Sequence, residues 1–155
     1  MTPLFKKLNL ADTRCIHVLN TPESFGDELR ALEGVDVSRS AQGRITFALA
    51  FVKTKQEVED TTDALIQAAE GDAQLWMVYP KGSSKKYKCE FNRNTGWKAL
   101  GEAGYEPVRQ VAIDEDWSAL RFRKAEFIKT MTRNPEGAIS SAGRKKALQQ
   151  RPGEA

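Results

Sequence analysis

The chain has 155 residues, of which 40% are hydrophobic and 29% charged, a composition typical of one globular domain. No apolar run approaches the roughly 18 to 20 residues that cross a membrane, and the N-terminus lacks the apolar region of a secretory signal. The two cysteines fit neither a disulfide framework nor a metal site, so we expect a cytoplasmic protein. The net charge of +3 is uneven, because residues 121–155 hold nine Lys or Arg and only three Glu.

The first third of the chain is predicted to hold an arm, a strand and a helix. Residues 1–13 show no clear periodicity and are predicted to be a loose N-terminal arm. Arg14–Leu19 is short and β-rich, and a helix follows it. Thr21 is placed to cap that helix, with Pro22 in the first turn, where a missing N–H group costs nothing. Val35–Ser38 is a candidate edge strand.

The middle of the chain predicts two buried strands joined by a helix. Ile45–Val52 is nearly all apolar, which is typical of a strand covered on both faces. Thr54 and Glu57 match a capping box, so a helix is predicted to begin there and to run to Gly71. Leu75–Tyr79 is the next buried strand. We expect these two strands to be adjacent, parallel and central.

After a short helix around Trp97, the chain predicts a hairpin. Val108–Ile113 and Ser118–Phe122 are separated by four residues, so they must pair antiparallel, and we expect an antiparallel edge strand. Trp117 is predicted to pack back on the sheet. The alternation of strands and helices over residues 14–124 indicates one three-layer, Rossmann-like α/β domain with a mostly parallel sheet and a C-terminal antiparallel hairpin strand. Residues 125–155 are predicted to be a basic extension, partly helical or disordered.

Open α/β sheets bind ligands beyond the carboxyl ends of their strands, and polar residues gather at these positions here. An anion could bind there, through lysine charges, hydroxyl groups and helix N-termini. A plain polar loop explains the same composition. The candidate ligand-binding residues are Asn20, Thr21, Lys53, Thr54, Lys81, Gly82, Ser83, Ser84 and Lys85.

No cofactor, metal ion or catalytic residue is predicted. The turn after Leu19 lacks the glycines of a dinucleotide or S-adenosylmethionine site, and Gly82 lacks the spacing of a phosphate-binding loop. His17, the only histidine, lies mid-strand and is interpreted as structural. The acidic residues Asp114–Asp116 resemble a carboxylate cluster, but a turn between two strands accounts for them more simply.

Three segments carry a resemblance to a known family: Leu19–Phe25, Tyr79–Lys81 and Val111–Arg121. The chain resembles an uncharacterised bacterial family known as domain of unknown function 3052. Its members show a Leu-Asn-x-Pro turn, a strand ending in Pro-Lys and a V-A/S-x-x-D/E-x-W-S/T-x-x-R segment. The resemblance implies a small cytoplasmic α/β domain of bacterial type and implies no activity.

Two classes of function remain open. The first is a non-catalytic binding or regulatory module with an anion-preferring site at the strand ends, which contacts an anionic small molecule, a nucleic acid or a protein through the basic loop and tail. The second is a small enzyme that acts on a phosphate- or carboxylate-bearing substrate. The absence of a recognisable nucleophile, metal cluster or cofactor loop favours the first, and no membrane contact is expected.

Overall fold

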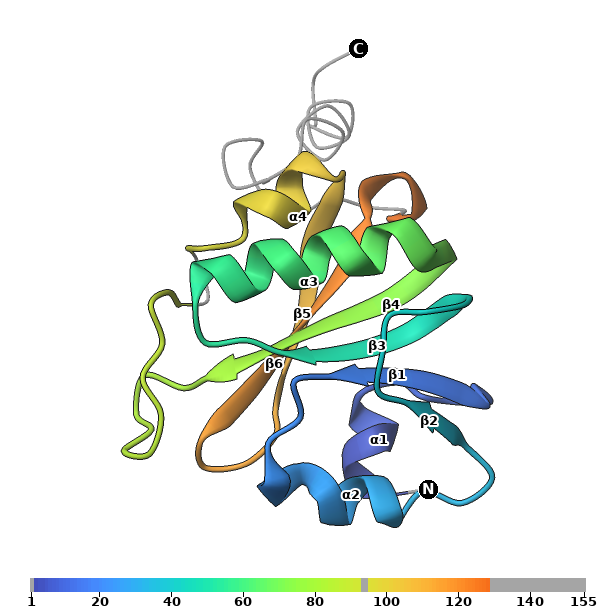
Figure 1. Ribbon diagram of the computed structural model, residues 1–155, viewed down its shortest axis with the longest axis horizontal. Helices are drawn as coiled ribbons and strands as arrows, with labels where there is room; N and C mark the ends of the chain where they lie inside the picture. Colours follow the sequence, from blue (N-terminus) through green and yellow to red (C-terminus); the bar gives the residue numbers. More distant parts are fainter. Residues whose placement is uncertain (1, 93–94, 129–155) are drawn as a thin grey trace, which may run out of the picture.

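The computed structural model describes residues 2–92 and 95–128, and its core is a six-stranded mixed sheet. The strand order is β2-β1-β3-β4-β6-β5. Figure 1 shows helices on both faces of this sheet, which makes the predicted three-layer α/β architecture of Rossmann-like type. The strands are β1 (Cys15–Leu19), β2 (Asp36–Ser38), β3 (Ile45–Phe51), β4 (Ala69–Pro80), β5 (Tyr105–Ala112) and β6 (Trp117–Lys124).

The first four strands are parallel, and the prediction for the two central strands is confirmed. β3 and β4 are adjacent and parallel, with Leu49 opposite Trp76. β2 is the short edge strand that Val35–Ser38 predicted, parallel to β1. The residues of β3 after Thr46 are all buried, as their near-continuous apolar run indicated.

The C-terminal hairpin is antiparallel as predicted, but its place in the sheet differs from the expectation. β6 pairs antiparallel with both β4 and β5, so it lies inside the sheet, and β5 forms the edge. The short connection between Val108–Ile113 and Ser118–Phe122 requires an antiparallel pair but does not decide which member contacts β4. The more continuously apolar member, β6, takes the inner place, with residues 117–120 all buried.

One face of the sheet is covered by α3 (Lys55–Ala68) and α4 (Lys98–Glu102) (Figure 1). The capping box of α3 is present, since the Thr54 hydroxyl accepts from the Glu57 backbone N–H at 3.1 Å and the Glu57 carboxylate accepts from that of Thr54. The helix ends at Ala68, before the predicted Gly71, because Ala69 already pairs with Ile45 and begins β4.

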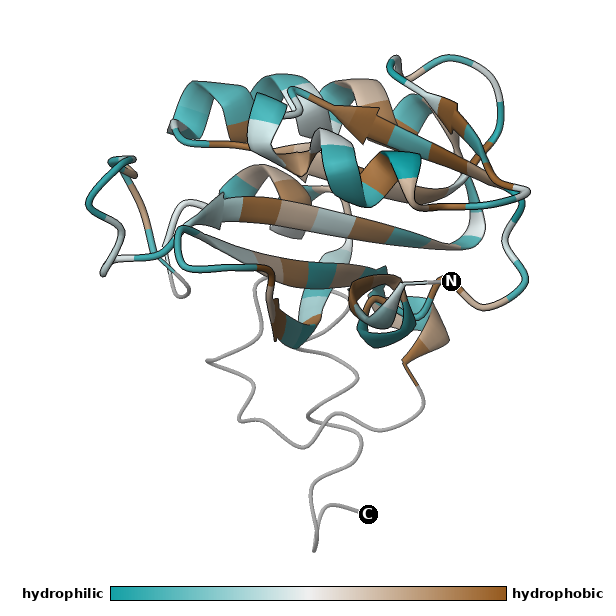
Figure 2. Ribbon diagram, turned by 90° about the horizontal axis from the view of Figure 1, so that it is seen from below, coloured by the Kyte–Doolittle hydropathy of each residue, from teal (hydrophilic) through white to brown (hydrophobic). Residues whose placement is uncertain are grey.

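The opposite face is covered by α1 (Pro3–Lys7), the 3-10 helix η1 (Glu23–Phe25) and α2 (Gly26–Arg30). The prediction of a loose N-terminal arm is therefore wrong for residues 2–13. The side chains of Phe5, Leu8 and Leu10 are fully buried against this face. Figure 2 shows the hydrophobic strand segments enclosed between helices whose outer turns are more hydrophilic.

Two further expectations concern the ends of elements, and a third concerns membrane spans. Thr21 does not cap the helix that follows β1, since Pro22 is the N-cap residue of η1 and makes no side-chain cap. The chain after β6 forms a 3-10 turn, η2 (Ala125–Phe127), and the rest of the predicted basic extension lies outside the described residues. Within the part of the chain that is described, no helix is long and apolar enough to cross a membrane.

Candidate functional site

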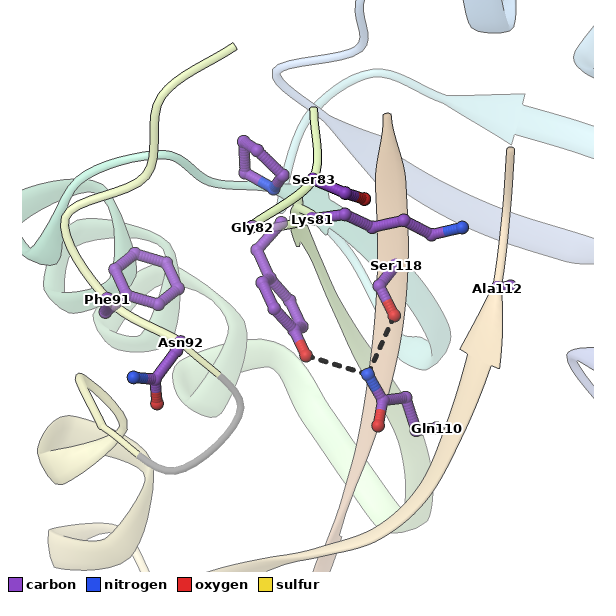
Figure 3. A pocket seen from close by; sticks show the side chains of 10 residues that line it. Lys81, Gly82, Ser83, Phe91, Asn92, Gln110, Ala112 and Ser118 are labelled. Atoms are coloured by element: carbon purple, nitrogen blue, oxygen red, sulfur yellow. Dashed lines mark hydrogen bonds between the residues drawn. The ribbon is translucent and has the colours of Figure 1, made fainter. Parts of the chain in front are cut away.

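A cavity of about 600 Å³ opens beyond the carboxyl ends of β4 and β5, on the face that α3 and α4 cover. β6 runs in the opposite direction, so it contributes its first residues to the same place. The loop that follows β4 closes one side of the cavity (Figure 3). The lining residues are Tyr79, Pro80, Lys81, Gly82, Ser83, Phe91, Asn92, Gln110, Ala112 and Ser118.

A hydrogen-bonded group of neutral side chains from three strands lies at one wall of this cavity. The side-chain amide nitrogen of Gln110 donates to the Tyr79 hydroxyl at 3.0 Å and to the Ser118 hydroxyl at 2.9 Å (Figure 3). Since an amide carries two hydrogens, both are used in these bonds. The amide oxygen of Gln110 and the hydroxyl hydrogen of Ser118 are groups that a bound molecule can contact.

Aromatic rings form the apolar part of the cavity. Tyr79 packs edge-on against Trp97 with ring centroids 5.4 Å apart, and Phe91 packs against the same ring at 4.8 Å. Phe91 is buried apart from 7% of its surface. Among the residues that the structure describes, Lys81 is the only charged one that lines the cavity. The arrangement is suited to a molecule with an apolar body and a neutral polar group.

The loop after β4 is fixed by contacts with the turn of the hairpin. The Lys81 backbone N–H donates to the Asp116 carbonyl at 2.7 Å, and the Ser84 hydroxyl donates to the Asp116 carboxylate at 2.9 Å. The same hydroxyl accepts from the Tyr87 backbone N–H at 3.1 Å. Tyr87 in turn packs on Trp117 with ring centroids 4.8 Å apart. Ser84 therefore holds the loop in place.

The structure places three of the nine predicted site residues, Lys81, Gly82 and Ser83, around this cavity. Asn20 lines a separate hollow, described below. Lys53 lies over the Tyr87 ring, 5.7 Å from its centroid, and Thr54 caps α3.

The other predicted positions also fall outside the cavity. Thr21 has a buried hydroxyl oxygen without a hydrogen-bond partner among residues 2–92 and 95–128. Lys85 is exposed and lines neither hollow. The nine residues lie past strand ends as expected, but they do not line one common cavity.

Sequence reasoning missed Gln110, Ser118 and Phe91. The first two lie on the hairpin and reach Tyr79 only because β6 lies beside β4. The signal available in the sequence was Ser118 itself, a polar residue between the apolar Trp117 and Ala119 in a predicted strand, and the structure shows it 5% exposed. Phe91 gave no signal, because it lies in a polar loop.

A second hollow of about 280 Å³ lies where the connections of the sheet reverse direction, between the ends of β1 and β2 and the first turns of α3. Its lining includes Asn20, Arg39 and Asp60. Asn20 adopts a positive φ of 58° at the turn after β1. The carboxylate of Glu57 also lines the hollow but is used in the capping box of α3.

Other candidate groups have structural roles. Both ring nitrogens of His17 contact backbone carbonyls, of Ser40 at 2.9 Å and of Arg44 at 3.2 Å, and the side chain is 3% exposed. The Asp114 carboxylate accepts from the backbone N–H groups of Asp116 and Trp117, as expected of a turn. No group of three potential metal ligands occurs within the described ranges. Burial raises the pKa of the Cys89 thiol, which disfavours a reactive thiolate.

No family model matches the chain, and no curated protein matches it in sequence. Solved structures with a similar fold include the N-methyltransferase NodS from Bradyrhizobium japonicum WM9, with a TM-score of 0.49 and 10% identity over 77% of this chain and 91% of that one. The ribosomal protein L11 methylase from Lactobacillus delbrueckii subsp. bulgaricus has a TM-score of 0.47 and 10% identity, covering 78% and 77%. A variant of LepI, solved in complex with SAH and a substrate analogue, has a TM-score of 0.45 and 11% identity, covering 79% and 47%.

These neighbours overturn one expectation from the sequence. Two of them are methyl-transferring enzymes by name, and the wall of the strand-end cavity is made of neutral hydrogen-bonding groups. Both findings stand against a non-catalytic binding or regulatory module with an anion-preferring site. That interpretation of the sequence is therefore wrong. At this level of identity the likeness concerns the fold alone.

Proposed function

We propose that the protein is an enzyme that acts on a small, uncharged organic molecule held in the strand-end cavity. The observation that carries this proposal is the bridge from Gln110 to Tyr79 and Ser118, which fixes neutral hydrogen-bonding groups at one wall of a 600 Å³ cavity. Volumes of roughly 300 to 1,000 Å³ with a few convergent polar groups are usual for small-molecule sites.

The lining favours a neutral molecule with an acceptor group such as a carbonyl. The Ser118 hydroxyl accepts from Gln110, so its own hydrogen can be donated toward the cavity. A fixed hydroxyl donor next to apolar walls orients a carbonyl and polarises it. A charged molecule is disfavoured, because Lys81 is the only charged side chain among the described residues that line the cavity.

A nucleoside cofactor such as the SAH bound to LepI does not fit the residues of this chain. Such ligands need the backbone to approach at the turn after the first strand. Here that turn contains Asn20 and Pro22, and the latter has no N–H group. The first glycine, Gly26, is already inside a helix, where the Arg30 guanidinium lies 3.1 Å from the place of an added Cβ. We derive no step through such a cofactor.

Membership of the family of domain of unknown function 3052 stays a proposal. It rests on the motifs in Leu19–Phe25, Tyr79–Lys81 and Val111–Arg121. The second motif contributes all three of its residues to the cavity, and the third includes Ala112 and Ser118. The first motif contributes Leu19 and Asn20 to the second hollow instead. This distribution supports the interpretation of the second and third motifs as parts of one site.

The proposal is tested with a matched pair of aromatic probes, benzamide and benzoate, followed by amide NMR on the full chain. We expect benzamide to shift the side-chain amide signal of Gln110 and the backbone signal of Ser118. Benzoate should bind more weakly, because the hydrogen-bonded wall of Tyr79, Gln110 and Ser118 is neutral. Gln110→Leu should weaken benzamide binding at least tenfold, since both hydrogen bonds of the bridge are lost.

The control is Gln67→Leu, which removes the same side chain from an exposed position of α3. This variant should bind benzamide as the unchanged protein does. Equal loss in both variants, or benzamide shifts located away from the cavity, would contradict the proposal. A screen of uncharged fragments in which none shifts Gln110 or Ser118 would contradict it as well.

A further inference from the structure

Three arginines share one face of the sheet, at the end farthest from β2. Arg109 on β5 lies directly opposite Arg121 on β6, and Arg123 follows two residues later. Because side chains of a strand alternate between faces, all three point to the side of Trp117 and Ala119. This is the face on which α1 and α2 lie, opposite to the strand-end cavity.

Only one of these arginines has a partner that balances its charge among the described residues. Arg123 binds Asp72 through two guanidinium nitrogens, with Nε 2.8 Å from Oδ1. The buried Glu106 also lies opposite Arg123 in the register of the sheet. Arg109 and Arg121 form no ion pair within residues 2–92 and 95–128.

Arg121 is the least compensated member of this group. It is half-buried, and its Nε has no hydrogen-bond partner in the part of the chain that the structure describes. Burial lowers the pKa of Arg121, and the neighbouring Arg123 lowers it further, while Asp72 acts in the opposite direction. Like charges directly opposite across a strand pair are destabilising, and an unpaired buried charge is costly. Within the described ranges, neither Arg109 nor Arg121 therefore has an acidic residue as its own ion-pair partner.

The strand on the other side of Arg121 adds a further unpaired donor. Trp76 is the β4 residue opposite Arg121, it is fully buried, and its Nε1 has no hydrogen-bond partner among the described residues. Unsatisfied buried donors are rare in folded proteins, so the two neighbouring positions mark this part of the sheet as unusual.

The sequence after residue 128 is poor in negative charge. It holds six Lys or Arg residues and two Glu, so its net charge is positive. An external anion would balance the charge of the two arginines.

We propose that Arg109 and Arg121 bind a phosphate group, on the face of the sheet opposite the strand-end cavity. A phosphate carries close to two negative charges and several acceptor oxygens, which match two uncompensated guanidinium groups better than a single carboxylate does. The phosphate belongs either to a small metabolite, as a terminal phosphate with close to two charges, or to a nucleic acid backbone, in which two neighbouring phosphodiesters supply one charge each. This site is independent of the proposed function of the cavity.

The test is titration of the full chain with pyrophosphate and with a short single-stranded oligonucleotide, followed by the arginine Nε–Hε NMR signals. We expect pyrophosphate to shift the signals of Arg121 and Arg109. Arg121→Met should reduce the affinity at least tenfold, and it should stay folded because an apolar group replaces an unpaired buried charge. Arg109→Gln, at an exposed edge position, gives the same test without disturbing the core.

The matched control is Arg44→Gln, which removes an exposed arginine that pairs with Glu70 elsewhere on the molecule. It should bind pyrophosphate unchanged. Stronger binding of the oligonucleotide than of pyrophosphate identifies nucleic acid as the source of the phosphate, and the reverse identifies a metabolite. The proposal is overturned if neither probe shifts Arg121, or if Arg121→Met and Arg109→Gln bind as tightly as the control.

Discussion

At the scale of single residues, Gly96 determines the shape of the cavity wall. Its φ of 90° lies in the region that favours glycine, and an added Cβ would lie 2.6 Å from the Cβ of Phe91 and 2.7 Å from its Cγ. Such distances do not occur in folded proteins, so Phe91 would have to move. Because Phe91 lines the cavity, Gly96 positions one side of the candidate site.

We predict that Gly96→Ala lowers the free energy of unfolding by about 2 to 4 kcal/mol, through backbone strain and overpacking together. Chemical denaturation measures the change. The control is Gly82→Ala, because an added Cβ there meets nothing within 4 Å. It should change stability by less than about 0.5 kcal/mol. Equal denaturation midpoints for the two variants would show that Phe91 yields without cost.

Single residues also show why the site was only partly predictable from the sequence. Lys81, Gly82 and Ser83 follow a strand end, which is a local feature, and they do line the cavity. Ser84 and Thr54 are also hydroxyl-bearing residues just after a strand end, but Ser84 contacts the hairpin turn and Thr54 caps α3. Composition does not distinguish a hydroxyl used within the fold from one that faces a ligand.

At the scale of elements, Trp117 joins the hairpin, the sheet and the basic loop. Its ring packs edge-on against Phe51 with centroids 5.2 Å apart and against Tyr87 at 4.8 Å. The side chain is 3% exposed, which confirms the predicted packing on the sheet. The loop after β4 therefore depends on the first residue of β6.

Trp117→Ala should lower the free energy of unfolding by about 3 to 5 kcal/mol, from lost apolar area and the cavity left behind. Trp117→Phe keeps a ring against Phe51 and should lose less than half as much. Thermal and chemical denaturation report both values. An unchanged melting temperature for the alanine variant would mean that the indole contributes nothing to the core.

The elements that were predicted from the sequence differ from those that were missed in two ways: in their length, and in how far apart in the sequence their contacting residues lie. The β3–α3–β4 unit was predictable, since a continuous apolar run, a capping box and a second apolar run are local signals. The five-residue α1 was not, because its stability comes from burying Phe5 with Leu8 and Leu10 against distant strands. The insertion of β6 beside β4 is a choice between long-range pairings, which no local pattern encodes.

At the scale of the whole molecule, the two hydrophobic clusters on either side of the sheet contain few titratable groups, so the alkaline limit of stability depends on a small number of buried acids. Tyr105 begins β5 and is 2% exposed. Burial raises its pKa, and the carboxylates of Glu126 and Asp72 raise it further. Burial likewise raises the pKa of Cys89.

We predict that the protein loses stability as the pH rises through about 10, where tyrosine ordinarily ionises. In the unfolded chain Tyr105 releases its proton at that pH, whereas the folded protein retains it to higher pH. The unfolded state therefore binds fewer protons above about pH 10, and the free energy of unfolding falls as the pH increases. Denaturation at about pH 8 and about pH 10.5, on either side of the ordinary tyrosine pKa, measures the loss. Tyr105→Phe removes this group without removing the ring, so the variant should lose less stability over the same interval. If the variant and the unchanged protein lose equal amounts, the alkaline sensitivity arises elsewhere and the buried phenol makes no contribution to it.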